Sequence, residues 1–255
     1  MNSKRLQLIA LRGLPLVEAG ASLAALIDAA STATGEGLAD GDVVVIAQKI
    51  VSKAEGRAVK LSTVTPSARA RELAPQVDKD PRLVEIILSE SSEVLRYRFG
   101  VLVVVHRLGM VLANAGIDAS NVADDGETVL LLPEDPDGTA ARLRSAFTER
   151  PGADVAVIVS DSVGRAWRQG TVGMALGAAG LPALLDLRGQ PDLFGRPLRV
   201  SEVGFADEIA SAASLLQGQG DEGAPVVVVR GLDWQGATEG TGADLIRPLA
   251  MDLFR

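Results

Sequence analysis

The sequence predicts an α+β fold in which helices flank a mixed α/β sheet. Apolar runs rich in Val and Ile alternate with Ala-rich amphipathic segments along the 255 residues, which is typical of a chain that forms both strands and helices. The apolar runs are not regularly separated by helical segments, and this argues against a plain doubly wound sheet. Only 3% of the residues are aromatic, so we expect a core of Ala, Val, Leu and Ile.

Apolar runs rich in β-branched residues are predicted to be strands. They span residues 6–10, 42–51, 101–107, 110–113, 128–132, 154–160 and 226–230. The Leu108-Gly109 pair between two of these runs predicts a hairpin. The stretch 175–179 is expected in the core.

Amphipathic segments are predicted to be helices, over residues 22–33, 67–77, 82–95, 139–149 and 206–216. Ser22 and Ser67 are residue types that cap helix N-termini, and Pro81 suits a first helical position. In the last helix Asp207 and Glu208 occupy the first turn, where the helix dipole favours carboxylates. Gly218 and Gly220 follow its end.

The segment 133–138, PEDPDG, is the clearest cluster of turn residues. We therefore expect any junction between subdomains near this segment, within one domain that spans residues 1–255. The sequence shows no fixed-period repeat and no low-complexity tract.

The composition excludes several classes of protein. The absence of cysteine excludes disulfides and thiolate metal sites, and the single His106 excludes a zinc site built from several histidines. A net charge of −8 argues against binding of nucleic acid. The first 20 residues are too polar for a signal peptide, and no apolar run is long enough to span a membrane. We expect a cytoplasmic protein.

Common nucleotide and hydrolase motifs are missing. The sequence has no G-x-x-x-x-G-K-[ST] phosphate loop, no G-x-G-x-x-G after a strand and no G-x-S-x-G elbow. A nucleotide, if one binds, must be held by a less common arrangement.

The segment 114–121, NAGIDASN, follows a predicted strand and offers oxygen ligands on a tight loop. Asp118, Ser120 and Asn121 suit a hard cation such as Mg²⁺ or Mn²⁺. The alternative is a turn whose polar side chains satisfy their own backbone.

A second polar segment, 160–170 or SDSVGRAWRQG, follows the predicted strand 154–160. Asp161 and Ser162 could supply carboxylate and hydroxyl oxygens to a metal, and Arg165 and Arg168 could hold phosphate or carboxylate. The alternative is a solvated turn before a charged helix.

Basic and glycine-rich segments complete the candidates. Residues 48–60 carry Lys49, Lys53 and Arg57, which suit a polyphosphate or, alternatively, a solvated edge strand. Residues 217–224, QGQGDEGA, form either a loop whose backbone approaches a ligand closely or a plain connection.

Together these segments resemble the coenzyme F420-0:L-glutamate ligase family. The matching stretches run in the family's order over nearly the whole chain: GLPLV, DVVVIAQKIVSKAEGR, NAGIDASNV, LLPEDPDGTA, VIVSDSVGRAWRQGTVG, ADEIASAASLLQGQGDEG and VVVVRGL. The resemblance implies a gamma-glutamyl ligase domain and a GTP-dependent addition of L-glutamate, through an amide bond, to the deazaflavin precursor coenzyme F420-0. It also implies further γ-linked glutamates in many relatives, two Mg²⁺ or Mn²⁺ ions, K⁺ and a homodimer.

By the same resemblance, the nucleotide site comprises Leu14, Pro15, Leu16, Val17, Gln48, Lys53, Asn121, Gln217, Gly218, Gln219, Gly220, Asp221, Glu222, Gly223 and Ala224. The metal positions are Asp118, Asp161, Ser162 and Gln219. The expected catalytic set is Asp118, Asp161, Arg165, Arg168 and Lys53.

Two positions depart from the family pattern. Gln48 stands where a small hydroxyl residue is common, and Gln219 stands where some relatives have a carboxylate. Some relatives also carry a C-terminal nitroreductase-type domain, and residues 244–255 resemble the approach to it. We expect no such domain here.

The expected route forms an acyl phosphate from GTP and the precursor's carboxylate, which the amine of glutamate then attacks. It requires Asp118 and Asp161, far apart in the chain, to meet in space. One rival interpretation is a metal-dependent phosphohydrolase that uses the same aspartates. The other is a non-enzymatic domain that binds anions.

Overall fold

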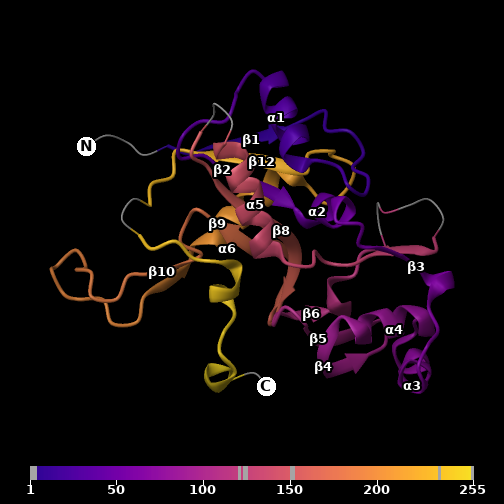
Figure 1. Cartoon of the computed structure of the whole chain (residues 1–255). Coiled ribbons are helices and arrows are strands. Elements are labelled where there is room, and N and C mark those ends of the chain that lie inside the picture. Colours follow the sequence, from indigo (N-terminus) through magenta and orange to yellow (C-terminus); the bar gives the residue numbers. More distant parts are fainter. Residues whose placement is uncertain (1–4, 120–121, 123–125, 150–152, 235–236, 254–255) are drawn as a thin grey trace.

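The computed structural model describes residues 5–119, 122, 126–149, 153–234 and 237–253. Its centre is a five-stranded mixed sheet in the order β1 (Gln7–Leu11), β12 (Val226–Arg230), β2 (Val43–Ala47), β8 (Ala156–Arg165) and β9 (Arg168–Ala179) (Figure 1). Strands β2 and β8 are parallel, and the other neighbours are antiparallel. This arrangement confirms the predicted mixed α/β fold class.

Helices cover both faces of this sheet. Val44 and Ile46 of β2 pack against the face covered by α1 (Leu23–Ala33), α2 (Gln48–Ala54) and α5 (Pro136–Thr148). Val43 and Val45 pack on the opposite face, against α6 (Phe205–Gln217). Because neither face meets water, a central strand is apolar at every position, which is why β2 reads VVVIA without alternation.

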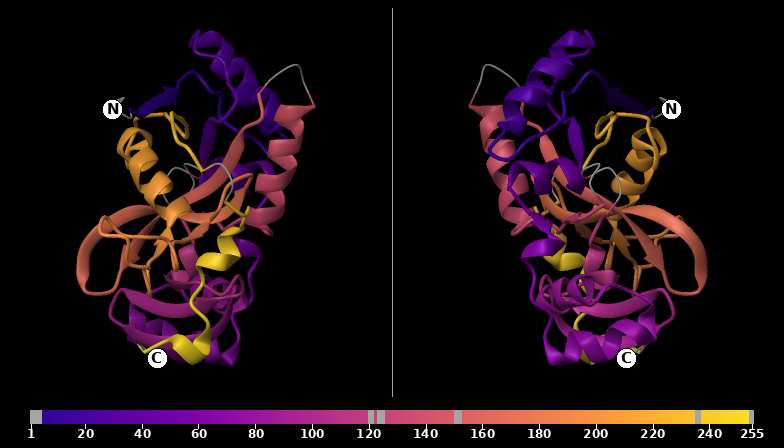
Figure 2. Two further views of the ribbon diagram at one scale, coloured as in Figure 1. Left: turned by 90° about the vertical axis from the view of Figure 1, so that its left-hand side faces the viewer. Right: turned by 90° about the vertical axis from the view of Figure 1, so that its right-hand side faces the viewer.

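A small lobe, residues 61–117, is inserted between α2 and α5. It contains α3 (Ala68–Val77), α4 (Pro81–Ser89), β4 (Ser91–Arg98), β5 (Val101–His106) and β6 (Val111–Ala113). The two helices cover one antiparallel sheet, with Leu73 and Ile87 in the same buried cluster as Leu102. Strands β3 (Ala58–Lys60) and β7 (Thr128–Leu130) pair beside the lobe. Figure 2 shows it on one side of the main sheet.

Most predicted elements are present with small shifts in their ends. Ser67 caps α3, since its Oγ accepts a hydrogen bond from the amide of Ala70. Asp80 caps α4 in the same way through the amide of Arg82, and Pro81 is the first helical residue. The predicted hairpin is confirmed, because β5 and β6 pair around Gly109, whose φ is 89°.

Two predicted elements are wrong in part. The run 42–51 is a strand only to Ala47 and continues as α2, from which Ile50 and Val51 pack onto the sheet. The predicted helix 82–95 ends at Ser89, and the residues after it form β4. Pairing with β5 outweighs the helical pattern there, since tertiary contacts override local propensity.

The largest omission is the hairpin of β8 and β9. The predicted strand ended at residue 160, whereas β8 continues to Arg165 and pairs with β9 along its length. The expected core stretch 175–179 is the buried end of β9. The pair β10 (Leu184–Asp186) and β11 (Glu202–Gly204) was also not predicted, and Figure 1 shows the segment between these strands projecting from the body.

The segment 133–138 leads from β7 back to the main sheet as the start of α5. Asp135 caps this helix by accepting a hydrogen bond from the amide of Gly138. The assignment of one ligase domain to the chain stays a prediction. In the described part of the chain, no helix combines the length and apolarity needed to cross a bilayer.

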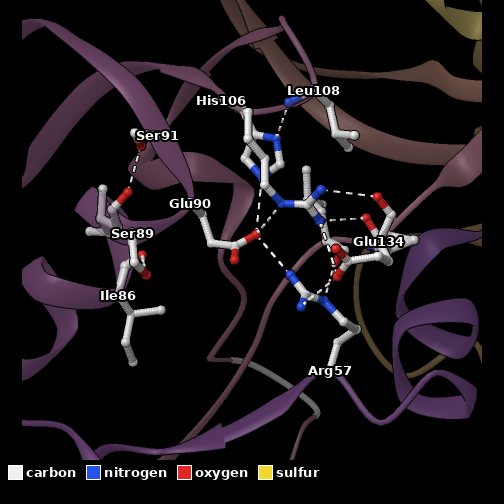
Figure 3. A network of polar contacts seen from close by, with 12 residues as sticks. Arg57, Ile86, Ser89, Glu90, Ser91, His106, Leu108 and Glu134 are labelled. Atoms are coloured by element: carbon white, nitrogen blue, oxygen red, sulfur yellow. Dashed lines mark hydrogen bonds and ion pairs between the residues drawn. The ribbon is translucent and has the colours of Figure 1, made fainter.

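A polar network joins the small lobe to the rest of the protein (Figure 3). The carboxylate of Glu90, at the end of α4, pairs with Arg57 Nη2 at 2.8 Å and with Arg107 Nε at 3.0 Å. Arg57 also donates from Nε to the Leu132 carbonyl at 2.9 Å and pairs with Glu134 at 2.9 Å. Burial opposes ionisation of Glu90, but its contacts with His106 and Arg107 and the charge of Arg57 lower its pKa to about 2.

Candidate active site

Four segments far apart in the sequence leave the main sheet at the same edge. Parallel pairing of Ala47 with Ser160 brings the carboxyl ends of β2 and β8 together. Val226, which begins the antiparallel strand β12, pairs with Ile46 and also with Leu11 at the end of β1. The residues after β1, β2 and β8 and those before β12 therefore converge, which is the position where open α/β sheets bind ligands.

A cavity of about 610 Å³ lies at this edge. It is lined by polar side chains from α2, from the end of the small lobe and from β8, and by the loop that precedes β12. Predicted site residues in this lining are Leu16, Gln48, Lys53, Asp118, Asp161, Ser162, Gln217, Gly218, Gln219, Gly220, Asp221, Gly223 and Ala224. The structure thus brings together most of the residues chosen from the sequence.

Other predicted residues are not part of this lining within the described residues. Val17 is buried and Leu14 packs partly buried against the core, while Pro15 and Glu222 are exposed to solvent beside the pocket. Asn121 lies outside the described residues.

Asp118 and Asp161 share the pocket although 43 positions separate them in the chain. Asp118 reaches it because its backbone pairs with Leu130, at N–O distances of 2.8 and 3.0 Å. Its carboxylate accepts a hydrogen bond from Gln48 Nε2 at 2.8 Å and lies 3.6 Å from Lys49 Nζ. The sequence prediction that the two aspartates meet in space agrees with this geometry.

Both carboxylates resist ionisation. Burial is the main cause for Asp161, and the nearby charge of Asp118 adds to it, so that the pKa of Asp161 rises to about 6. Burial also raises the pKa of Asp118, although Lys49 and Gln48 oppose the rise. A pair of close, half-buried carboxylates attracts a cation, because a positive charge between them offsets both burial and repulsion.

The oxygen donors fit a hard divalent cation. Ser162 and Gln219 are linked to each other by a hydrogen bond of 2.6 Å from Gln219 Nε2 to Ser162 Oγ. The described residues contain no group of three or more His, Cys, Asp or Glu side chains that could hold a metal. Two carboxylates with hydroxyl and amide oxygens suit Mg²⁺ or Mn²⁺, whose remaining positions water or phosphate oxygens commonly fill. Gln219 offers only a neutral amide.

The loop after α6 holds an anionic group of its own. The amide of Gly220 donates a hydrogen bond to the Glu222 carboxylate at 2.8 Å. The amides of Glu222, Gly220 and Gln219 together lower the pKa of Glu222. Clustered backbone N–H groups of this kind bind phosphate as well as carboxylate.

Two relations between residues of α2 were not predicted from the sequence. Ser52 Oγ donates to Gln48 Oε1 at 2.9 Å, which turns the Gln48 amide nitrogen toward Asp118. Lys49 and Lys53 both line the cavity because α2 places residues four apart on one face. Residues 48–51 of α2 were predicted to be the end of a strand. In a strand, side chains four positions apart lie too far from each other for either relation.

Arg165 and Arg168 lie at the tip of the β8–β9 hairpin, not in the lining of the cavity among the described residues. Arg165 Nη1 contacts the carbonyl of Gly170 at 3.4 Å, and Arg168 is exposed. Trp167 between them has a φ of 65° and an exposed fraction of 87%. The pocket and the two guanidinium groups are thus separate in one copy of the chain.

Comparison with known proteins gives a consistent picture. A family model described as F420-0:Gamma-glutamyl ligase matches residues 13–231. The chain is 48% identical to the coenzyme F420:L-glutamate ligase of Methanothermobacter thermautotrophicus, over 98% of this chain and 99% of that protein. It is 43% identical to the protein of the same name from Archaeoglobus fulgidus, over 98% and 97%, and 42% identical to that from Natronomonas pharaonis, over 94% and 91%.

Proposed function

We propose a reaction for this chain from the premise that it belongs to the F420-0:Gamma-glutamyl ligase family and is a ligase that forms carbon–nitrogen bonds. The proposed reaction joins L-glutamate through an amide bond to coenzyme F420-0, a phospholactyl-deazaflavin, at the expense of GTP. Further γ-linked glutamates are added in later rounds. One observation carries the proposal: a single pocket contains two coupled carboxylates, two lysines and a glycine-rich loop.

The acyl group is activated first. The γ-phosphoryl group of GTP is transferred to the lactyl carboxylate of the precursor, which gives an acyl phosphate and GDP. The α-amine of glutamate then attacks the acyl carbon, phosphate leaves and the amine loses a proton. Phosphoryl transfer asks a protein mainly for positioning and for neutralisation of charge.

The residues of the pocket divide this work. Lys53 and Lys49 offset the charge of the polyphosphate, and the loop 217–224 holds the nucleotide through its backbone amides. Asp118, Asp161, Ser162 and Gln219 would hold Mg²⁺ or Mn²⁺. When bound, these ions neutralise phosphate oxygens and allow carboxylates and phosphates to share one site. Without a cation, the two aspartates would repel the triphosphate.

One assay tests the reaction. Phosphate release and product mass are measured with GTP, Mg²⁺ or Mn²⁺, glutamate and coenzyme F420-0, each omitted in turn. We expect phosphate release and a product heavier by one or more glutamyl residues only when all are present, and loss of both with a chelator. Phosphate release without glutamate and acceptor would instead indicate a phosphohydrolase. Chelator-insensitive binding without turnover would indicate an anion-binding domain.

We also propose that the protein is a cytoplasmic homodimer and that K⁺ assists the reaction. Large apolar side chains on peripheral segments support the dimer: Leu193, Phe194 and Val200 between β10 and β11 are exposed by 99%, 84% and 84%. Trp167 at the hairpin tip is exposed as well. Apolar groups gathered on projecting segments are typical of surfaces that bind another chain.

A dimer would give Arg165 and Arg168 access to the pocket of the second copy, where they would hold the acceptor or glutamate. The double variant Arg165→Ala/Arg168→Ala is then expected to be inactive, as is Asp161→Asn. Mixing the two after reversible dissociation should restore about a quarter of the wild-type activity, because half the dimers are mixed and each has one intact site. An active double-arginine variant, or no recovery on mixing, would contradict a shared site.

A further inference from the structure

The hydroxyl of Ser160 has no hydrogen-bond partner among the described residues, although Ser160 is only 1% exposed. Within the same part of the chain, the one other buried side-chain atom of this kind is His106 Nε2, which lies outside the pocket and 3.6 Å from Glu90. Comparable hydroxyls are satisfied: Ser52 donates to Gln48, and Ser211 donates to the carbonyl of Gly173. Ser160 is therefore an exception that calls for a physical reason.

Burial of an unpaired hydroxyl destabilises the free protein, since the group loses its bonds to water without replacement. The three residues before Ser160 in β8 are Val157, Ile158 and Val159, all fully buried. A small apolar residue would fit the same strand at no such cost. A hydroxyl at this position is explained if a bound ligand supplies its hydrogen-bond partner. Ser160 lines the cavity in which that ligand would bind.

The face of the sheet on which the Ser160 side chain lies indicates which part of a ligand its hydroxyl would contact. Ala156 and Ile158 belong to the cluster on the α6 face of the sheet, and Val157 and Val159 to the cluster on the opposite face. The pairing of β8 with β9 shifts between Val159 and Ser160, and after the shift Ser160 lies opposite Ala175, which belongs to the cluster on the α6 face. Ser160 is on that face too, because residues directly opposite each other on antiparallel strands point to the same side. Ser162 on the same face contacts Gln219 of the glycine-rich loop, whereas Asp161 contacts the α2 side. Ser160 thus faces the loop 217–224 rather than the aspartate pair.

We infer that Ser160 binds nucleotide directly: its Oγ–H donates a hydrogen bond to a phosphate oxygen of the nucleotide held by the loop 217–224. The inference rests on the proposed function for the identity of that ligand. Phosphate oxygens are strong acceptors, and the loop presents backbone donors to the same group. The bond forms only in the complex, which accounts for an unpaired hydroxyl in the free protein.

Ser160→Ala separates this role from a structural one. We expect the affinity for GTP, measured by calorimetry, to fall about tenfold or more, because a hydrogen bond to a charged group is lost. The free variant should melt at the same temperature as the wild type or higher, since the unpaired hydroxyl is gone. A structural serine would behave in the opposite way. Ser31→Ala, a buried serine of α1 outside the cavity lining, is the matched control and should bind GTP normally.

Further titrations distinguish the ligand. Mn²⁺ binding without nucleotide is expected to be equal in Ser160→Ala and in the wild type. Unchanged GTP affinity at saturating Mn²⁺, or weaker Mn²⁺ binding in the absence of nucleotide, would overturn the inference. The same titrations are run with GTP and with ATP, so that the role of Ser160 is tested separately from the proposed ligase reaction. A wild type that binds nucleotide but forms no amide product defeats the proposed function alone, and the affinities still decide the role of Ser160.

Discussion

Asp161→Asn and Asp118→Asn are each expected to reduce glutamate-dependent GTP turnover by a hundredfold or more. Either change removes one of the two anionic oxygen donors in the pocket and keeps the shape of the side chain. A single charge contact in a phosphoryl-transfer site is worth about 3 kcal/mol in the transition state, which corresponds to roughly a hundredfold in rate. Turnover at saturating Mn²⁺ and GTP, followed as released phosphate, measures the loss.

Asp161→Asn should lower turnover but should not lower the stability of the metal-free protein at pH 7. The pKa of Asp161 rises from 3.8 to about 6 on folding, so the folded protein holds a proton that the unfolded chain releases. In the metal-free wild type, the stability from this group is therefore lost as pH rises from about 4 to about 6. The loss amounts to at most about 3 kcal/mol, and Asp161→Asn should abolish it. The metal-free variant is then at least as stable as wild type at pH 7.

Urea denaturation in EDTA at several pH values, beside the activity assay, separates chemistry from folding. Asp186→Asn is a suitable control, since Asp186 lies outside the cavity lining and pairs with Arg188 on the surface. It should turn over normally. Near-normal turnover in both Asp118→Asn and Asp161→Asn would refute the metal assignment. A metal-free Asp161→Asn protein that is less stable than the wild type at pH 7 would refute the electrostatic account.

The residues that carry charge were easier to find from the sequence than the backbone that places them. Asp118 and Asp161 stood out because a carboxylate that follows an apolar run, with small residues beside it, is well placed to bind a ligand. Both now line one cavity. The position of Lys49 beside Asp118 was not visible, because residues 48–51, QKIV, carry no helix signal and were predicted to be the end of the strand.

The hairpin of β8 and β9 shows a different limit. Its outer part, residues 161–173, is polar and glycine-containing, so it has no alternation of apolar side chains to mark a strand. Backbone pairing between two long strands stabilises it instead. The sequence therefore predicted Arg165 and Arg168 beside Asp161, whereas each residue along an extended strand adds about 3.3 Å of separation. The pattern of apolar residues therefore predicts the buried part of a strand, but not a polar part that extends into solvent.

Glu90→Ala is expected to lower the free energy of unfolding by about 1.5–3 kcal/mol, because it removes charged hydrogen bonds from two partly buried arginines, which keep Glu134 as a second partner. The side chains of Arg57 and Arg107 are exposed by only 18% and 29%. Urea denaturation at pH 7 measures the loss. Glu93→Ala, an exposed acid on the neighbouring strand β4, should change stability by less than about 0.5 kcal/mol.

The same change should reach the active site through the backbone. The carbonyl of Arg57 accepts from the amide of Leu131, and its side chain donates to the carbonyl of Leu132, close to the residue that pairs with Asp118. Loss of Glu90 removes one of the contacts that hold the Arg57 side chain in place, so weaker Mn²⁺ binding should accompany the lower stability. The pKa of Glu90, about 2, also fixes a pH window: its stabilisation is present above about 4.5 and disappears as pH falls toward 2. The network does not hold the small lobe in place if the free energy of unfolding of Glu90→Ala is within about 1 kcal/mol of the wild-type value and both proteins show the same acid transition.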